Sequence, residues 1–182
     1  MFTHQPVVLD TCVIINLLAT NRVSEIVRTL APRCLICSAV SGESLYLRSM
    51  QADQGPEVVD LKQLFDEGAF EKCEIQGDQE EAFYVGYALE LDDGEAMSLA
   101  IAQSRNFSLA TDERKARRVL RENAAGLTVI STTEIVHAWG KDQLEQDLIT
   151  AIHLIRERAR FQPPDSDPLA RWWNMLLQKR DL

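Results

Sequence analysis

The sequence of 182 residues is poor in the residues that mark fibrous or low-complexity proteins, with only 8 glycines and 6 prolines. Long apolar runs are also missing. The runs at residues 7–9 and 13–15 fall far short of the roughly 20 residues that a membrane span needs. No basic stretch precedes an apolar segment at the N-terminus, so we expect no signal peptide, no membrane association and a cytoplasmic location.

An excess of positive charge is lacking as well, because 19 Lys and Arg stand against 28 Asp and Glu, giving a net charge of −9. This balance argues against a protein that coats nucleic acid by bulk electrostatics, since phosphate binding needs Lys and Arg. It does not exclude a nucleic-acid enzyme, because carboxylates that bind divalent cations make the metal-free chain acidic. Residues 141–182 carry seven acidic and seven basic side chains, so the surplus lies in residues 1–140.

Cysteine and histidine are too few and too scattered for a structural zinc site. Cys34 and Cys37 form the only CxxC pair, and the three histidines are far apart in the sequence. The pair falls in a predicted strand, where positions i and i+3 point to opposite faces. We therefore expect all four cysteines to be free thiols in a reducing compartment.

Short apolar strands alternate with helices along the first 140 residues. The pattern predicts strands at 6–10, 34–37, 107–110 and 127–130, with a possible short extended piece at 73–75. It predicts helices at 11–19, 22–30, 38–50, 57–65, 79–89, 93–103 and 112–122, and a capping box at 131–134 opens another. This alternation indicates an α/β fold, a three-layer α/β/α arrangement around a parallel sheet of four to five strands.

The last 42 residues have a different character, so we divide the chain into a sheet domain (1–140) and a C-terminal helical extension (141–182). A helix is predicted at 142–160, a proline-rich break at 162–168, and a final helix with Pro168 in its first turn. We expect Trp172 and Trp173 to anchor this extension by packing, because large aromatic side chains mostly bury area.

Acidic residues follow the predicted strands, where open α/β sheets bind their ligands. Asp10 ends the first strand and Asp112 ends the third, while Glu43 follows the second. The start of the predicted helix at 93–103 adds Asp92, Asp93 and Glu95. Helix capping is the simpler explanation for each of these acids except Glu43.

Glu43 shares its predicted helix face with Val40 and Leu47, three residues before it and four after it. A lone carboxylate on such an apolar face is costly without a partner. Several carboxylates around a cation remove that cost, and oxygen-only ligands favour Mg²⁺ or Mn²⁺. Such a cation would activate water for attack on phosphorus, and Thr111 or Ser38 would orient water or a carboxylate from behind.

A basic stripe follows Asp112 directly, with Arg114, Lys115, Arg117 and Arg118 in one predicted helix and Arg121 shortly after. These side chains could hold a phosphodiester next to the acids. The alternative is a solvated helix face, paired with Glu113 and Glu122. The sequence leaves both interpretations open.

Four segments carry a resemblance to a known family. They are residues 8–18 (VLDTCVIINLL), 38–43 (SAVSGE), 91–102 (LDDGEAMSLAIA) and 109–117 (LATDERKAR). In order and spacing they resemble the four acidic motifs of PIN-domain nucleases, over roughly residues 5–138. The form of the third motif is similar to the branch that includes VapC-type toxins.

The resemblance implies a metal-dependent endoribonuclease that acts on RNA, with Asp10, Glu43, Glu95 and Asp112 as catalytic, metal-binding acids and Asp93 assisting. It also implies a homodimer and inhibition by an antitoxin protein, as in a type II toxin–antitoxin module. Two features depart from the pattern: Glu95 stands where Asp is commoner, and Gly42 loosens the helix before Glu43.

Two other functions compete with this one. The first is an inactive PIN scaffold that binds RNA or a protein, which the presence of all the acids disfavours. The second is a Mg²⁺-dependent phosphatase of the haloacid dehalogenase type, disfavoured because Cys12 stands where that chemistry needs an aspartate.

Overall fold

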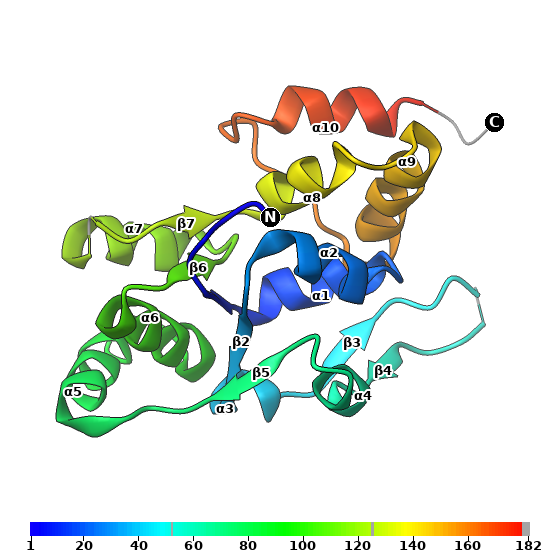
Figure 1. Ribbon diagram of the computed structural model, residues 1–182. Helices are drawn as coiled ribbons and strands as arrows, with labels where there is room; N and C mark the ends of the chain where they lie inside the picture. The colour runs from blue at the N-terminus through cyan, green and yellow to red at the C-terminus, as the bar shows by residue number, and fades with distance from the viewer. Residues whose placement is uncertain (52, 125, 180–182) are drawn as a thin grey trace.

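Five parallel strands form the central sheet of the computed structural model, which describes residues 1–51, 53–124 and 126–179 (Figure 1). The strand order is β5-β2-β1-β6-β7, with β1 and β6 paired in register from Val7 with Ser108 to Leu9 with Ala110. The strands are β1 (Val7–Leu9), β2 (Cys34–Cys37), β5 (Glu71–Cys73), β6 (Ser108–Ala110) and β7 (Val129–Ile130). The predicted parallel α/β sheet is confirmed.

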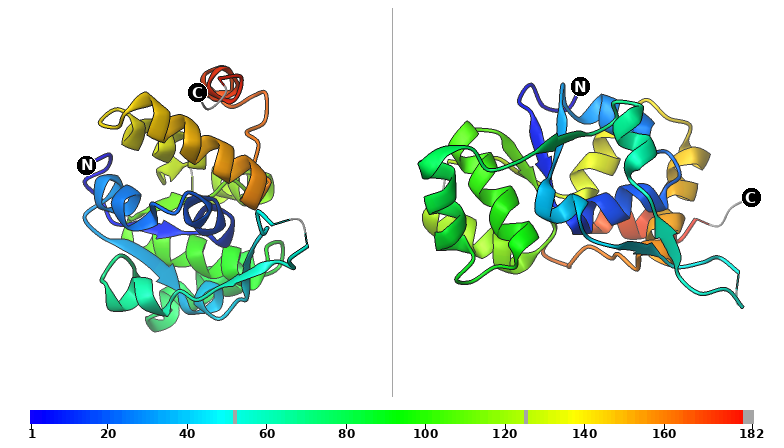
Figure 2. Two further views of the ribbon diagram at one scale, coloured as in Figure 1. Left: turned by 90° about the vertical axis from the view of Figure 1, so that its right-hand side faces the viewer. Right: turned by 90° about the horizontal axis from the view of Figure 1, so that it is seen from below.

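Helices cover both faces of this sheet, as a doubly covered parallel sheet requires (Figure 2). On one face, α6 (Asp93–Arg105) contacts β1, β2 and β6, and α5 (Gly77–Tyr87) packs against α6. On the other face, α1 (Thr11–Ala19), α2 (Val23–Leu30) and α8 (Thr132–Gly140) pack on one another. Two further helices concern the site: α3 (Ser38–Ser41), which follows β2, and α7 (Arg114–Asn123), which follows β6.

The predicted helix over 38–50 is wrong, because α3 ends after one turn at Ser41. Gly42 follows as its C-cap, and the chain then forms β3 (Leu45–Leu47). Leu45 and Leu47 are buried while Tyr46 between them is exposed, which is the period of a strand. Glu43 therefore lies beyond a helix end instead of on an apolar helix face.

The predicted helix over 57–65 is wrong in its first half. Residues 57–59 form β4 (Glu57–Val59), which pairs antiparallel with β3, and the helix α4 covers only Lys62–Asp66. Val58 and Val59 are β-branched and suit a strand better than a helix. A hairpin pairing of this kind depends on the partner strand. The hydrophobic period of one segment alone does not reveal that partner.

The C-terminal segment packs against α1 and α8 (Figure 1). It consists of α9 (Glu145–Leu154), a π-helical turn η1 (Ile155–Ala159) and α10 (Ala170–Leu177). Trp173 is fully buried and meets Phe161 edge to face at 5.6 Å, and Trp172 meets His137 at 4.8 Å. Both tryptophans therefore pack as predicted, although α10 starts after Pro168 instead of including it.

All four cysteines are free thiols, as predicted, and Cys34, Cys37 and Cys73 are buried. Burial raises the pKa of Cys34 and of Cys73 to about 12, so both stay protonated at neutral pH. Within the described residues, none of the helices is long and apolar enough to cross a membrane.

Candidate functional site

Asp10 lies at the carboxyl end of β1 and is only 4% exposed. Its Oδ1 accepts a hydrogen bond from the backbone N–H of Thr11 at 2.8 Å, so it does cap α1. Its Oδ2 accepts from the hydroxyl of Thr111 at 2.7 Å and from the thiol of Cys12 at 3.3 Å. Thr111, at the end of the neighbouring strand, thus fixes the orientation of the Asp10 carboxylate.

Glu43 reaches the same edge of the sheet from the loop after α3. Its Oε2 accepts from the hydroxyl of Thr11 at 2.9 Å. Its Oε1 lies so close to the start of α6 that a Cβ on Gly94 would approach it to 2.8 Å. The glycine therefore leaves the space that the Glu43 carboxylate occupies.

Asp92 and Glu95 form the reciprocal capping box that starts α6. The backbone N–H of Glu95 donates to Asp92 Oδ1 at 2.8 Å, and the N–H of Asp92 donates to Glu95 Oε2 at 3.3 Å. Both carboxylates also interact electrostatically with Asp10. We call Asp10, Glu43, Asp92 and Glu95 the acid cluster.

Electrostatics inside the acid cluster are unfavourable for negative charge. Burial raises the pKa of Asp10, of Glu43 and of Glu95 above their ordinary values, and the charge of Asp92 raises each further. Hydrogen bonds from Thr111 and Thr11 offset only part of this effect. Carboxylates in such a setting gain stability from a nearby cation.

Asp112 follows β6 and is held differently. Its Oδ1 accepts from the backbone N–H of Thr132 at 3.0 Å, and its Oδ2 accepts from the Thr132 hydroxyl at 2.6 Å and from Asn16 Nδ2 at 3.1 Å. Cys12 Sγ accepts from the Asp112 N–H at 3.4 Å and so links it to Asp10. Burial raises the pKa of Asp112, while the bonds from Thr132 lower it in part.

Two of the other predicted site residues have partners outside the acid cluster. Asp93 is exposed and accepts from the hydroxyl of Tyr84 at 3.2 Å. Ser38 Oγ donates to Met97 Sδ at 3.5 Å. Neither contact involves a carboxylate of the acid cluster.

A cleft of about 1130 Å³ opens beside Asp112. We call it the arginine cleft, because Arg114, Arg117 and Arg121 of α7 line one side of it. Arg117 donates twice to the carbonyl of Thr111, at 2.9 and 2.7 Å, which fixes its guanidinium at the end of β6. Arg118 instead pairs with Glu90 at 2.8 Å, and Lys115 is exposed outside the cleft lining.

Sequence reasoning missed four residues of this site: Cys12, Asn16, Gly94 and Thr132. It named Asp92 among the acids after the strands but gave the metal-binding roles at the start of α6 to Asp93 and Glu95. Asn16 had a usable signal, because it is a polar residue inside an otherwise apolar helix. The contacts of Cys12 and Thr132 join segments about 100 and 20 residues apart, so local sequence carries no trace of them.

A family model described as a PIN domain matches residues 6–166 of the chain, which is most of its length. The chain belongs to the PIN-domain family. The resemblance of the four acidic segments is thus confirmed at the level of the family. PIN domains are generally nucleases and typically bind divalent metals. No curated protein and no solved structure matches the chain.

The donor set of this PIN domain suits a hard divalent cation, since the acid cluster offers only oxygen ligands. Across residues 1–51, 53–124 and 126–179, no three His, Cys, Asp or Glu side chains already converge as a metal-binding group. Glu43 is exposed and Glu95 is half-buried, so both have room to turn toward a cation. Asp10, buried and held by Thr111, would be the fixed member.

Proposed function

We propose that this PIN domain is an endoribonuclease that hydrolyses RNA phosphodiester bonds with Mg²⁺ or Mn²⁺. The observation that carries the proposal is the acid cluster at the carboxyl ends of the strands, beside a cleft lined by arginines. Carboxylates alone would repel RNA, and arginines alone would bind it without cutting. Side by side, the two groups meet the needs of a metal-dependent nuclease.

The acids that would hold the cation are Asp10, Glu43 and Glu95, joined by Asp92 and with Asp112 at the cleft side. A bound divalent cation supplies an activated water and offsets charge on the scissile phosphate. Thr111 keeps Asp10 oriented, and Thr11 keeps Glu43 near the start of α6. An ionised carboxylate has about four acceptor sites, and three donors bind Asp112. The carboxylate can therefore still accept a further hydrogen bond.

The substrate side of the proposal is the basic helix α7. Arg114 and Arg117 line the arginine cleft and would bind the phosphates flanking the scissile bond. Lys115 and Arg118, outside the lining, would add long-range attraction for the strand. The likeness of the third motif to the VapC branch supports RNA as the substrate. It also supports our finer proposals of a homodimeric, cytoplasmic toxin with a cognate antitoxin.

Two measurements on the full chain test the proposal. The melting temperature should rise with Mn²⁺ concentration, by the equivalent of about 2.7 kcal/mol at a hundred times the dissociation constant. Metal-dependent cutting of RNA should occur, while small phosphate esters stay intact. Asp112→Asn should lose cutting, and Glu81→Gln on the exposed face of α5 should keep it. A parent protein that neither responds to metal nor cuts RNA contradicts the proposal.

An inactive scaffold that binds RNA is the second candidate. It is favoured by the structural roles that the acids already have, because Asp10 and Asp92 cap helices and Asp112 is held by three donors. This candidate predicts RNA binding that is independent of Mn²⁺ and no cutting with any divalent cation. The same two measurements therefore separate it from the nuclease.

A further inference from the structure

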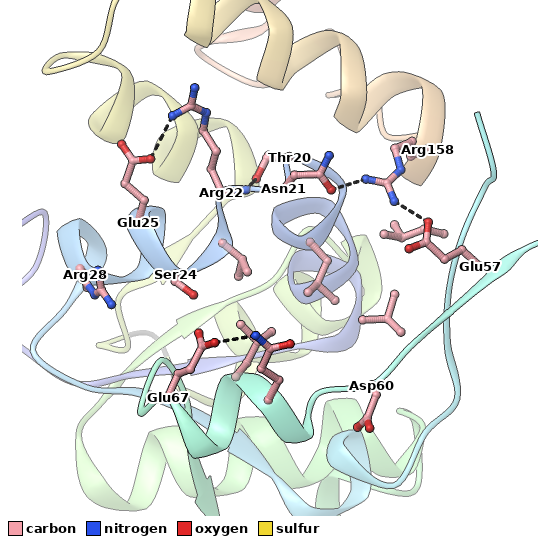
Figure 3. Close-up of a pocket in the computed structure, with 16 residues that line it drawn as sticks. Thr20, Asn21, Arg22, Ser24, Glu25, Arg28, Glu57, Asp60, Glu67 and Arg158 are labelled. Carbon is pink, nitrogen blue, oxygen red and sulfur yellow. Dashed lines mark hydrogen bonds and ion pairs between the residues drawn. The ribbon is translucent and has the colours of Figure 1, made fainter. Parts of the chain in front are cut away.

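The three arginines near the end of η1 have three different surroundings. Arg158 is buried, donates to the Ala19 carbonyl at 3.1 Å and to Asn21 Oδ1 at 2.6 Å, and pairs with Glu57 at 2.7 Å (Figure 3). Arg156 is exposed and does not line the arginine cleft. Arg160 is exposed and does line it. Arg158 therefore connects segments of the fold, and Arg160 is the one of the three that faces the proposed substrate.

The backbone at Arg160 adopts the left-handed conformation, with φ 58° and ψ 25°, directly after η1. Glycine is the usual residue at such a helix end, because a Cβ is disfavoured there. Local stability therefore does not explain an arginine at this position. A non-glycine residue held in this region is a reason to ask for a function.

The chain after the turn at Arg160 lines the same cleft as α7. Phe161, Gln162, Pro164, Ser166, Asp167 and Pro168 follow and line the cleft with it. Phe161 is half-buried, with its ring edge to face against the buried Trp173. This part of the cleft lining thus offers a cation and an aromatic ring that packs against the core.

The acidic and the basic side chains that line the cleft differ in whether they have partners. Glu134 accepts from the N–H and hydroxyl of Ser131, and Asp167 accepts from the hydroxyl of Thr133 and the N–H of Leu169. In the part of the chain that the structure describes, none of the four cleft arginines (Arg114, Arg117, Arg121 and Arg160) forms an ion pair with a carboxylate. Arg117 interacts electrostatically with Asp112, so Arg114, Arg121 and Arg160 are the cleft arginines with positive charge available for an anionic ligand.

We propose that residues 159–168 form the second wall of the RNA-binding cleft, and that Arg160 contacts a backbone phosphate of single-stranded RNA lying between this wall and α7. Phe161 presents a ring on which a base can stack, which suits an unpaired strand. This inference rests on the proposed function, because it takes RNA as the ligand. It assigns the C-terminal segment a role in substrate binding.

The test measures binding, so it does not require cutting. A labelled single-stranded RNA is titrated into the full chain carrying Asp10→Asn, across a range of salt concentrations. Adding Arg160→Gly should weaken binding by roughly tenfold at low salt and lower the slope of log K against log salt by about 0.7, the value for one phosphate contact on a single strand. The matched control Arg156→Ala removes an exposed charge from the same helix end and should change neither quantity.

Folding is monitored in the same variants. Arg160→Gly should melt at the same temperature or higher, since glycine prefers the left-handed conformation. Arg160→Lys keeps the charge and should keep the salt slope. Equal binding by the Arg160→Gly and Arg156→Ala proteins overturns the inference, as does a fall in melting temperature that accounts for the lost binding. If binding depends on Arg160 but the parent never cuts RNA, this inference stands and the nuclease proposal fails.

Discussion

Asp10 and Asp112 follow the ends of two neighbouring strands, β1 and β6, yet the protein stabilises them in different ways. Asp10 is buried and Asp112 is half-buried, and burial raises the pKa of each. Each aspartate accepts three hydrogen bonds, but their charged neighbours differ: the charge of Asp92 raises the pKa of Asp10 further, whereas the charge of Arg117 lowers the pKa of Asp112. The contrast teaches that Asp10 has more negative charge left to be balanced by a cation than Asp112 has. The effect of Asp10 on the stability of the protein should therefore depend on metal and pH. The effect of Asp112 should depend on the hydrogen-bond donors that hold it.

The largest effect is expected from Asp10→Asn. Losing the fixed ligand of the acid cluster should reduce RNA cleavage by about 10³-fold or more, since metal catalysis supplies several kcal/mol. The metal-free variant should nevertheless be more stable than the parent, because a disfavoured charge is removed. A gain of ~1 kcal/mol would raise the melting temperature by roughly 2–4 °C in a chain of this size. Calorimetry in a chelator measures the gain in stability, and an RNA cleavage assay with Mn²⁺ measures the loss of activity.

The pH dependence of that gain provides its control. A carboxylate with a raised folded-state pKa destabilises the fold only when ionised, so the penalty is absent below its ordinary value of 3.8 and full above the raised pKa. The stability difference between Asp10→Asn and the parent should therefore be largest at neutral pH and shrink as pH falls toward 4. A difference that stays constant across this range would mean that Asp10 carries no electrostatic penalty.

Thr132→Val probes the other side of the comparison. It removes the hydroxyl that bonds Asp112 at 2.6 Å and leaves a buried carboxylate with one donor fewer. The expected loss is about 1–3 kcal/mol of unfolding free energy, independent of metal. Thr128→Val, at an exposed threonine before β7, should cost much less. If Thr132→Val stabilised the metal-free protein as Asp10→Asn is expected to, the two aspartates would not differ as we argue.

The sheet and its flanking helices could be predicted because their signals are local. The apolar runs of β1, β2 and β6 and the capping boxes of α6 and α8 lie within a few residues of the elements that they specify. The β3–β4 hairpin could not be, because its pairing joins residues 45–47 to 57–59 and each strand alone also suits a short helix. Gly42 was the available warning that the helix after β2 ends early.

The candidate site was predictable only in part, for a related reason. The motifs identify which carboxylates follow strands, and the parallel sheet brings Asp10 near the start of α6. Which of the two adjacent aspartates at the start of α6 interacts with Asp10 depends on the cap geometry. In the structure the charge of Asp92 acts on Asp10, while Asp93 bonds Tyr84. The hydrogen bonds from Asn16 and Thr132 to Asp112 are tertiary contacts, and no local sequence pattern predicts them.

Gly94→Ala sharpens the Asp10 side of the comparison. The new Cβ would lie 2.8 Å from Glu43 Oε1 and 3.1 Å from a methyl of Val40, so the Glu43 carboxylate must move away from α6. We expect Mn²⁺ affinity to fall about tenfold, or 1.4 kcal/mol, with little change in metal-free stability because alanine favours the helix. Gly86→Ala on α5 is the matched control, since its Cβ would meet nothing within 4 Å. Unchanged Mn²⁺ affinity in Gly94→Ala would remove Glu43 from the proposed ligand set.

The smallest effect is expected from Cys12→Ser, at the residue that joins the two sides. Its thiol donates to Asp10 at 3.3 Å and accepts from the Asp112 N–H at 3.4 Å, so it bridges the aspartates as a neutral group. Burial raises the pKa of Cys12 far above neutrality, and the charges of Asp10 and Asp112 raise it further. A serine hydroxyl can donate and accept at the same place, so stability should change by less than ~1 kcal/mol and RNA cleavage by only a few-fold. Cys12→Ala removes both bonds and should cost more in denaturant unfolding. Loss of cleavage in Cys12→Ser at unchanged stability would instead assign the sulfur a direct role in catalysis.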